Sequence, residues 1–317
     1  MPKIAILDDY ANAALSSADW SNLPDGFEPV VFTDNLVEHD GLVARLQEFE
    51  IVCAMRERTP FPTGVVSRLP NLKLFITSGM RNNAVDFTTL RANGVVCCGT
   101  ESPGGTTTEL TWALILGVMR NVAFDHRTMK DGGWQARTGQ GLEGKTLGLV
   151  GLGRLGGMVA AIAPHFGMNV IAWSPNLTQE RCDEAGVEKV TKEALFRRAD
   201  VVSIHMVLSD RSRGLVGATE LGWMKPTAVL VNTSRGPIVT EAALIAALTG
   251  GTIRAAAVDV YDVEPLPADH PYRRIENLLT TPHVGYVTEE SYRVFYGQMV
   301  ENIIAWAAGA PVREIAA

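Results

Sequence analysis

The sequence predicts an α/β fold built from two doubly wound parallel-sheet units. Short apolar runs rich in valine and isoleucine recur along the 317 residues without alternating with polar residues, which is typical of strands covered on both faces. Polar or amphipathic segments separate the runs, and this alternation favours parallel strands joined by helices. Glycines also cluster at 151–156, directly after one apolar run, where a strand is expected to turn sharply into a helix.

The first unit is predicted from five apolar runs that lie within residues 1–98. The expected strands are 4–7, 29–32, 51–55, 72–76 and 95–98. The segment 106–121 that follows carries a strong helical pattern, and we expect it to form a helix that connects the two units.

The second unit begins at residue 147 and is predicted from six further runs. The expected strands are 147–151, 169–173, 201–205, 228–231, 256–260 and 278–280. Helices are expected at 192–199, 241–250 and 288–309. Thr240 stands where the N-cap of the helix at 241–250 should lie, and the last helix begins with Thr288 followed by two acidic residues. Because the final helix follows the last strand of the second unit, we expect it to return to the first.

Composition excludes several classes of function. The net charge of −7 and the pI near 5.5 argue against a nucleic-acid-binding surface. The N-terminal apolar run stops at Asp8 and Asp9, so we do not expect it to act as a signal peptide, and no apolar stretch is long enough to span a bilayer. The four cysteines form no CxxC pair and are expected to be buried free thiols, with no metal site. We therefore expect a cytoplasmic protein with no membrane or nucleic-acid partner.

The glycine cluster has the spacing Gly151-x-Gly153-x-x-Gly156 between a strand and a helix. The first glycine allows a tight turn, the second lets backbone N–H groups approach a pyrophosphate, and the third lets helix and strand pack closely. Arg154 and Leu155 then open the helix, whose N-terminus attracts phosphate groups. The pattern predicts dinucleotide binding.

The loop after the second strand of this unit bears on the choice of cofactor. An Asp or Glu there would bind the adenosine ribose and repel a 2′-phosphate, but the loop offers Ser174, Asn176 and Thr178 instead. Arg181 could add positive charge, whereas the arginine that usually follows such a strand is missing. Charge therefore favours NADP over NAD and leaves NAD open.

Three functional side chains stand in loops after strands of the second unit, namely Arg235, Glu264 and His283. Such loops face the ligand crevice of an open parallel sheet. Arginine can bind a carboxylate and a neighbouring oxygen in a fork, and histidine can exchange a proton near neutral pH. A glutamate bonded to the second imidazole nitrogen would fix its tautomer and favour imidazolium. Singly, each residue could be a surface charge or a structural group, but their joint placement predicts a catalytic site.

In these motifs the sequence resembles the D-isomer-specific 2-hydroxyacid dehydrogenase family. The resemblance rests on GLGRLG, on NTSRGPIV with Arg235, on DVYDVEPLP with Glu264 and on PHVGY with His283, and it covers essentially the whole chain. It implies a Rossmann cofactor domain at 99–284, inserted into a flavodoxin-like catalytic domain formed by 1–98 and 285–317. It also implies cofactor contacts from Thr107, Met206, Val207, Thr233, Asp259 and Gly285, with Asp259 on the nicotinamide carboxamide. The family's H-x-P-L has become His205-Met206-Val207-Leu208.

The substrate loop departs from the family pattern. Backbone N–H groups of Ser78, Gly79 and Met80 are expected to hold the substrate carboxylate, but Arg81 replaces a glycine of the family's loop. Together with Arg56, Arg81 is expected to bind a second anionic or polar group of the substrate, or else to pair with nearby acids. This departure leaves the identity of the substrate open.

The resemblance implies an NAD(P)-dependent oxidoreductase acting on a small 2-keto or D-2-hydroxy acid, as a glyoxylate or hydroxypyruvate reductase. Activity of the phosphoglycerate dehydrogenase type is one alternative, and a dinucleotide-sensing corepressor is another from a different class. Glu264 disfavours the related formate dehydrogenases, which use glutamine there. Family precedent suggests a homodimer that uses the helix at 106–121. His126, His165 and His205 match no catalytic motif and are interpreted as structural.

Overall fold

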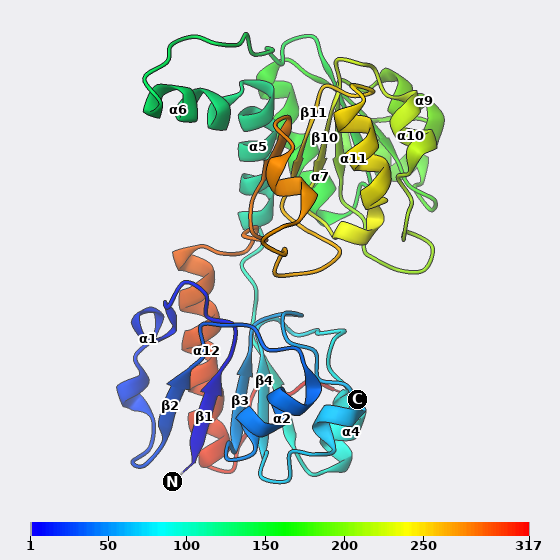
Figure 1. The fold of residues 1–317 in the computed structure, drawn as a ribbon. Helices are drawn as coiled ribbons and strands as arrows, with labels where there is room; N and C mark the ends of the chain where they lie inside the picture. The colour runs from blue at the N-terminus through cyan, green and yellow to red at the C-terminus, as the bar shows by residue number, and fades with distance from the viewer. Residues whose placement is uncertain (1, 317) are drawn as a thin grey trace. The chain divides into compact units, whose positions relative to one another are not determined.

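Parallel pairing joins the strands into one five-stranded and one seven-stranded sheet, which confirms the predicted α/β class (Figure 1). The computed structural model describes residues 2–316. The chain divides into two compact units, each built around one sheet. Unit 1 comprises the residues up to Gly104 and those from Val287 onward, and unit 2 runs from Gly105 to Tyr286.

The sheet of unit 1 has the strand order β2-β1-β3-β4-β5. Its strands are β1 (Lys3–Ile6), β2 (Glu28–Val31), β3 (Ile51–Ala54), β4 (Leu74–Thr77) and β5 (Val96–Gly99). Its helices are α1 (Ala14–Ser17), α2 (His39–Leu46), α3 (Thr63–Val66), α4 (Phe87–Ala92) and α12 (Glu289–Ala307), with a 3₁₀ turn at Trp20–Asn22. Every residue of β3 and β4 is buried, as expected of strands covered on both faces.

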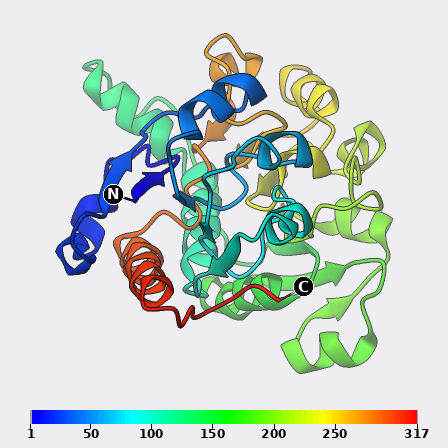
Figure 2. The same cartoon turned by 90° about the horizontal axis from the view of Figure 1, so that it is seen from below.

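Helix α12 brings the last part of the chain back to unit 1. The Thr288 hydroxyl accepts a hydrogen bond from the Ser291 N–H and caps the helix. The helix packs against β4 and α1, and Figure 2 shows it almost end-on. Beyond it, the segment around Glu314 pairs antiparallel with Cys98 and covers the edge of β5.

The sheet of unit 2 has the order β12-β11-β10-β9-β6-β7-β8. Its strands are β6 (Thr146–Val150), β7 (Asn169–Trp173), β8 (Glu188–Lys189), β9 (Val201–Ile204), β10 (Val229–Asn232), β11 (Ala255–Val258) and β12 (Leu278–Thr280). Its α-helices are α5 (Thr106–Met119), α6 (Val122–Lys130), α7 (Arg154–Ile162), α8 (Gln179–Ala185), α9 (Lys192–Arg198), α10 (Ala218–Trp223) and α11 (Glu241–Thr249). Short 3₁₀ helices lie at Ala163–Phe166, Gly236–Ile238 and Pro271–Arg274.

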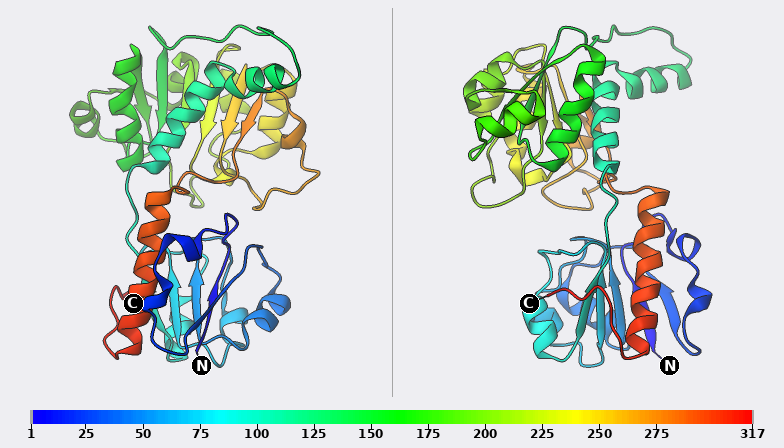
Figure 3. Two further views of the ribbon diagram at one scale, coloured as in Figure 1. Left: turned by 90° about the vertical axis from the view of Figure 1, so that its left-hand side faces the viewer. Right: turned by 180° about the vertical axis from the view of Figure 1, so that it is seen from behind.

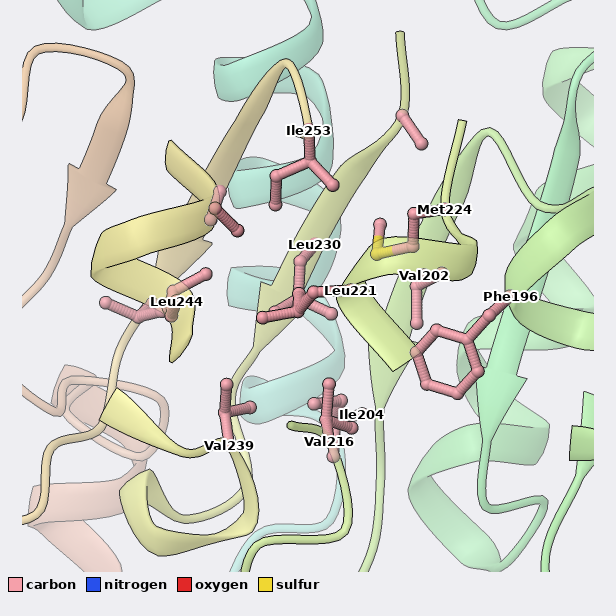
Figure 4. Close-up of a cluster of buried hydrophobic side chains, with 14 of the residues drawn as sticks. Phe196, Val202, Ile204, Val216, Leu221, Met224, Leu230, Val239, Leu244 and Ile253 are labelled. Carbon is pink, nitrogen blue, oxygen red and sulfur yellow. The ribbon is translucent and has the colours of Figure 1, made fainter. Parts of the chain in front are cut away.

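Alternate residues of the unit 2 strands enter two separate cores, because successive side chains of a strand point to opposite faces. Val202 contributes to the core under α9, α10 and α11, whereas its neighbour Val201 packs under α5 and α7. Figure 4 shows the first core, in which Phe196, Leu221 and Leu244 from the helices meet side chains of β9 and β10. Strand order reverses at β6, which pairs with both β7 and β9, and ligands bind at such switch points in open α/β sheets.

Unit 2 differs from the sequence prediction in three details. The helix predicted at 106–121 ends at Met119, and Asn121 takes a left-handed conformation (φ 56°) before the separate helix α6. Helix α6 projects from the rest of the unit (Figure 3, right). The edge strand β8 was not predicted, because both of its residues are exposed and carry no apolar signal. Thr240 stands at the N-cap of α11, but its side chain makes no capping hydrogen bond.

Within residues 2–316, no helix combines the length and apolar character needed to cross a membrane.

Candidate active site

The three predicted catalytic residues lie at one edge of the unit 2 sheet. Arg235 follows β10, Glu264 follows β11 and His283 follows β12, and these strands are neighbours in the sheet. Parallel strands end at the same edge, so the fold places all three loops on the side where open α/β sheets bind ligands.

Glu264 and His283 form a direct hydrogen-bonded pair. The His283 Nδ1 lies 2.5 Å from the Glu264 Oε2, and each side chain is 21% exposed. The second carboxylate oxygen accepts a hydrogen bond of 2.9 Å from the Tyr261 N–H. Because Nδ1 bonds to the carboxylate, Nε2 is the imidazole nitrogen that would exchange a proton with a substrate.

His283 has a left-handed backbone conformation (φ 54°), and a buried carboxylate holds the turn around it. Asp259 accepts hydrogen bonds from the Thr281 hydroxyl (2.6 Å), the Val284 N–H (2.8 Å) and the Gly285 N–H (2.9 Å). Burial is the main cause that raises the pKa of the Asp259 carboxyl. This anchoring role was not predicted from the sequence, and the expected contact of Asp259 with a carboxamide stays a prediction.

Arg235 is half-buried and its loop is braced by a buried amide. The Asn232 Nδ2 donates to the Arg235 carbonyl (3.0 Å), and the Asn232 Oδ1 accepts from the Ser234 N–H (3.0 Å). The guanidinium donates to the Ser234 carbonyl (2.7 Å). The two Asn232 bonds fix the backbone from which the Arg235 side chain starts, and the bond to Ser234 fixes its guanidinium, so the end of β10 sets the position of Arg235.

The glycine turn has the form of a phosphate cradle. Gly151 has φ 104°, and a Cβ there would lie 2.5 Å from the His205 carbonyl oxygen. A Cβ on Gly156 would collide with the Gly151 carbonyl, whereas at Gly153 it would meet no atom within 4 Å. The turn is therefore closed on the protein side and open at Gly153, where the N-terminus of α7 begins.

The residues that open α7 leave this N-terminus accessible. Arg154 is exposed and Leu155 is half-buried. The cradle fits a dinucleotide pyrophosphate, which the N–H groups of the turn and of the helix N-terminus would hold.

The loop after β7 contains no carboxylate from Ser174 to Thr178. Thr178 caps α8, because its hydroxyl oxygen accepts the Arg181 N–H (3.2 Å). The Arg181 Nε donates to the Leu152 carbonyl (3.1 Å), so its guanidinium lies beside the glycine turn. Asn176 is exposed at the middle of the loop.

The remaining residues expected to contact cofactor also lie in unit 2. The Thr107 hydroxyl donates to the Gly285 carbonyl (3.1 Å), and the buried Thr233 hydroxyl lies 2.9 Å from that of Thr111. Val207 is 79% exposed beside Met206. Thr107 and Gly285 therefore bring the start of α5 to the turn of His283, while the expected cofactor contacts stay predictions.

In unit 1, two of the N–H groups expected to bind a carboxylate are already bonded. The Ser78 N–H donates to the Ala54 carbonyl (3.0 Å), and the Gly79 N–H donates to the Thr100 hydroxyl (2.9 Å). The Ser78 bond continues the pairing of β4 with β3 into the loop, and the expected contacts of Ser78, Gly79 and Met80 with a substrate carboxylate stay predictions. The Met80 side chain is 43% exposed.

Arg56 lies across the backbone of this loop. A Cβ added to Gly79 (φ 85°) would lie 2.5 Å from the Arg56 Nη1. The Arg56 backbone is itself left-handed (φ 52°), with its N–H bonded to the Ser78 hydroxyl (2.9 Å) and its carbonyl to the Asn82 amide (2.6 Å). Arg81 is exposed. Of the two arginines predicted to contact the substrate, Arg56 is therefore the one whose guanidinium lies against the loop backbone, in the space that a side chain at Gly79 would fill.

The other histidines differ from His283 in their surroundings. The His205 Nε2 lies 2.9 Å from the Ser203 hydroxyl, and burial lowers the pKa of the His205 imidazole to about 4. His126 and His165 are exposed. Among the described residues, no group of three or more His, Cys, Asp or Glu side chains could hold a metal ion. All four cysteines are buried free thiols, as predicted.

Comparisons with known proteins agree with this geometry. The family profile described as "D-isomer specific 2-hydroxyacid dehydrogenase, NAD binding domain" matches residues 112–285, which identifies a nicotinamide dinucleotide-binding domain. Glyoxylate reductase of Aeropyrum pernix is 38% identical over 257 residues, covering 77% of this chain and 76% of that protein. A crystal structure of phosphoglycerate oxidoreductase from Vibrio cholerae has 35% identity and a TM-score of 0.91, covering 98% of this chain and 100% of the other.

A longer relative is D-3-phosphoglycerate dehydrogenase of Archaeoglobus fulgidus, 33% identical over 282 residues. The alignment covers 87% of this chain but 53% of that protein, so this chain spans about half of its length. The profile match covers more than half of the chain and includes the glycine turn and all three catalytic candidates. The chain therefore belongs to the D-isomer-specific 2-hydroxyacid dehydrogenase family.

Proposed function

We propose that this protein is an NAD(P)H-dependent reductase of small 2-keto acids, which in reverse oxidises D-2-hydroxy acids. The observation that carries the proposal is the hydrogen bond of 2.5 Å between His283 and Glu264, at the same edge of the sheet as Arg235. An acid–base pair and a fixed cation are what the reduction of a keto acid requires from a protein. Unit 2 would bind the cofactor, and unit 1 would contribute to substrate binding.

Each catalytic residue has a separate task in this scheme. The bound nicotinamide nucleotide supplies the hydride that C2 of the keto acid accepts. Arg235 binds the carboxylate and polarises the keto oxygen. His283, protonated, donates the Nε2 proton to that oxygen as it gains negative charge, and Glu264 stabilises the imidazolium before the transfer. In the reverse direction, neutral His283 accepts the hydroxyl proton.

We further propose a preference for NADPH over NADH. Two observations support it: residues 174–178 include no carboxylate that would repel a 2′-phosphate, and the Arg181 guanidinium lies beside the glycine turn. The Ser174 hydroxyl and the Asn176 amide can donate hydrogen bonds to a phosphate. The ratio of kcat/KM for NADPH to that for NADH tests this preference, and a ratio below one would contradict it.

Glyoxylate and hydroxypyruvate are the proposed substrates, in line with the names of the reductases among the relatives. Arg56, held against Gly79, would bind a polar or anionic group of the substrate. The deciding experiment is a panel of keto acids that includes phosphohydroxypyruvate, each reduced with NADH and with NADPH. Replacing His283 by alanine should lower kcat by about 10²- to 10⁴-fold on the best substrate. The absence of hydride transfer over the whole panel, with cofactor binding retained, would instead favour a dinucleotide sensor.

We also propose that the protein acts as a homodimer through unit 2. Helix α6 has no buried residue, and it carries Val122 (58% exposed) and Met129 (54% exposed) on a projecting segment. Trp134, which follows it, is 72% exposed. Large apolar side chains exposed together mark interaction surfaces. Sedimentation velocity should give a mass twice 34.2 kDa, and Trp134→Ser should shift the equilibrium toward monomer. A monomer at high protein concentration would contradict this proposal.

A further inference from the structure

Tyr261 lies where the three catalytic loops meet. It follows the end of β11 and is only 7% exposed, with its ring in the core of unit 2. The ring of Tyr272 packs against it, with 6.3 Å between the ring centroids. The mechanism described above assigns it no task, yet it contacts all three loops.

The backbone of Tyr261 fixes the carboxylate of Glu264. Its N–H donates to Oε1 (2.9 Å), while Oε2 bonds to the His283 Nδ1 (2.5 Å). Each carboxylate oxygen therefore has its own partner, and rotation of the carboxylate would break both bonds.

The hydroxyl of Tyr261 fixes the turn of His283. It donates to the Thr281 carbonyl (2.7 Å), which also accepts the His283 N–H (3.0 Å). Burial raises the pKa of the Tyr261 phenol well above its ordinary value, so the hydroxyl remains a donor throughout the neutral range. The left-handed conformation of His283 is thus held by Tyr261 as well as by Asp259.

The loop of Arg235 touches the same residue. A Cβ on Gly236 would collide with the carbonyl group of Tyr261 and would lie 2.6 Å from the Asp262 nitrogen. Glycine at 236 therefore lets the backbone after Arg235 lie directly against the backbone of Tyr261.

We propose that Tyr261 is a positioning residue that holds Glu264 and His283 in register, the first through its backbone N–H and the second through its hydroxyl. The hydroxyl is the part of Tyr261 that a substitution can remove alone. Without it, the Thr281 carbonyl keeps a single donor, and the turn holds the imidazole less firmly against the Glu264 carboxylate.

The test is Tyr261→Phe, read by proton NMR of the protein without substrate. A proton shared between imidazole and carboxylate over 2.5 Å resonates far downfield of ordinary ring N–H protons, and its absence from His283→Ala assigns it. In Tyr261→Phe we expect this resonance to move upfield and to exchange faster with solvent. Tyr272→Phe is the matched control, because it removes the hydroxyl of another buried tyrosine in the same core. This hydroxyl bonds to neither Glu264 nor Thr281.

An unchanged resonance and exchange rate in Tyr261→Phe would overturn the proposal. Gly236→Ala is a second variant for the case that Tyr261→Phe does not fold, because the added Cβ must displace the Tyr261 backbone and should alter the same resonance. The kinetic arm rests on the proposed function: Tyr261→Phe should lower kcat by about two- to twelvefold with little change in KM. If the parent reduces no keto acid, the proposed function fails while the NMR result still decides the positioning role.

Discussion

Replacing Glu264 by glutamine tests the acid–base pair with the smallest change in shape. The side chain keeps its length, but it loses its negative charge and one of its two acceptor oxygens, so the amide can accept from the His283 Nδ1 or from the Tyr261 N–H but not from both. The pair is short, at 2.5 Å, and each side chain is 21% exposed, so solvent screens it less than a surface ion pair. The variant therefore removes the charge that stabilises the imidazolium and can keep the contact with His283 only at the expense of the Tyr261 N–H bond.

The size of the effect follows from this geometry. A hydrogen bond to a charged group contributes about 1.5–3 kcal/mol, and the partial burial of this pair keeps it in that range. If His283 must be protonated when it donates to the keto oxygen, this energy is lost from the transition state. At about 1.4 kcal/mol for each factor of ten, kcat for keto acid reduction should fall by about 10- to 150-fold.

The assay is steady-state reduction of the best keto acid, followed by the absorbance of the reduced nicotinamide. The matched control is Glu241→Gln, which removes a carboxylate that lies 3.1 Å from His270 elsewhere in unit 2 and should leave kcat unchanged. A decrease of less than about threefold for Glu264→Gln would refute the reasoning, because the carboxylate charge would then make no substantial contribution to the chemical step. An equal decrease in both variants would assign the effect to unit 2 as a whole.

Three further predictions concern binding, stability and reactivity. Gly156→Ala forces the Gly151 carbonyl to move, so a fluorescence titration should show that NADH and NADPH affinity falls by at least about tenfold. Burial lowers the pKa of the His205 imidazole from 6.5 to about 4, so the stability that the neutral ring contributes is present above pH 6.5 and is lost as the pH falls toward 4. Between pH 6.5 and pH 4, the free energy of unfolding measured with denaturant should therefore fall by about 3 kcal/mol less in His205→Gln than in the parent protein. Burial raises the pKa of Cys97 to about 11 and of Cys98 to about 12, so both thiols should react with a disulfide reagent far more slowly in the native protein than in denaturant.

The sequence was a good guide to the strands, because most of them are buried on both faces and are therefore written as continuous apolar runs. The runs at 51–55 and 169–173 coincide with β3 and β7 to within one residue. Strand β8 carries no such signal, because it consists of Glu188 and Lys189, both exposed at the sheet edge, and its pairing with β7 depends on the fold around it.

Functional side chains were easier to predict than their hydrogen bonds. Arg235, Glu264 and His283 stand in motifs, and parallel pairing suffices to bring their loops to one edge. The partners of Asp259 and of the Gly79 N–H could not be predicted, because a buried polar group bonds to whichever neighbour the packed fold brings within reach. The Asp259 carboxylate, which we expected to contact the cofactor, accepts hydrogen bonds from the turn after His283. The Gly79 N–H, which we expected to contact the substrate, donates to the Thr100 hydroxyl.

These unpredicted bonds explain how loops without regular structure can hold a catalytic pair. His283 has a positive φ, which costs a non-glycine residue on the order of 1–3 kcal/mol and persists only where the surrounding structure holds it. Asp259 and Tyr261 provide that fixation from inside the core, one by accepting backbone N–H groups and the other by donating to a carbonyl. Both lie next to the end of β11, so the rigidity of the central sheet is passed to the catalytic imidazole through buried hydrogen bonds. Sequence changes on the exposed surface of these loops should therefore be tolerated, whereas changes to the buried partners should act on catalysis as strongly as on stability.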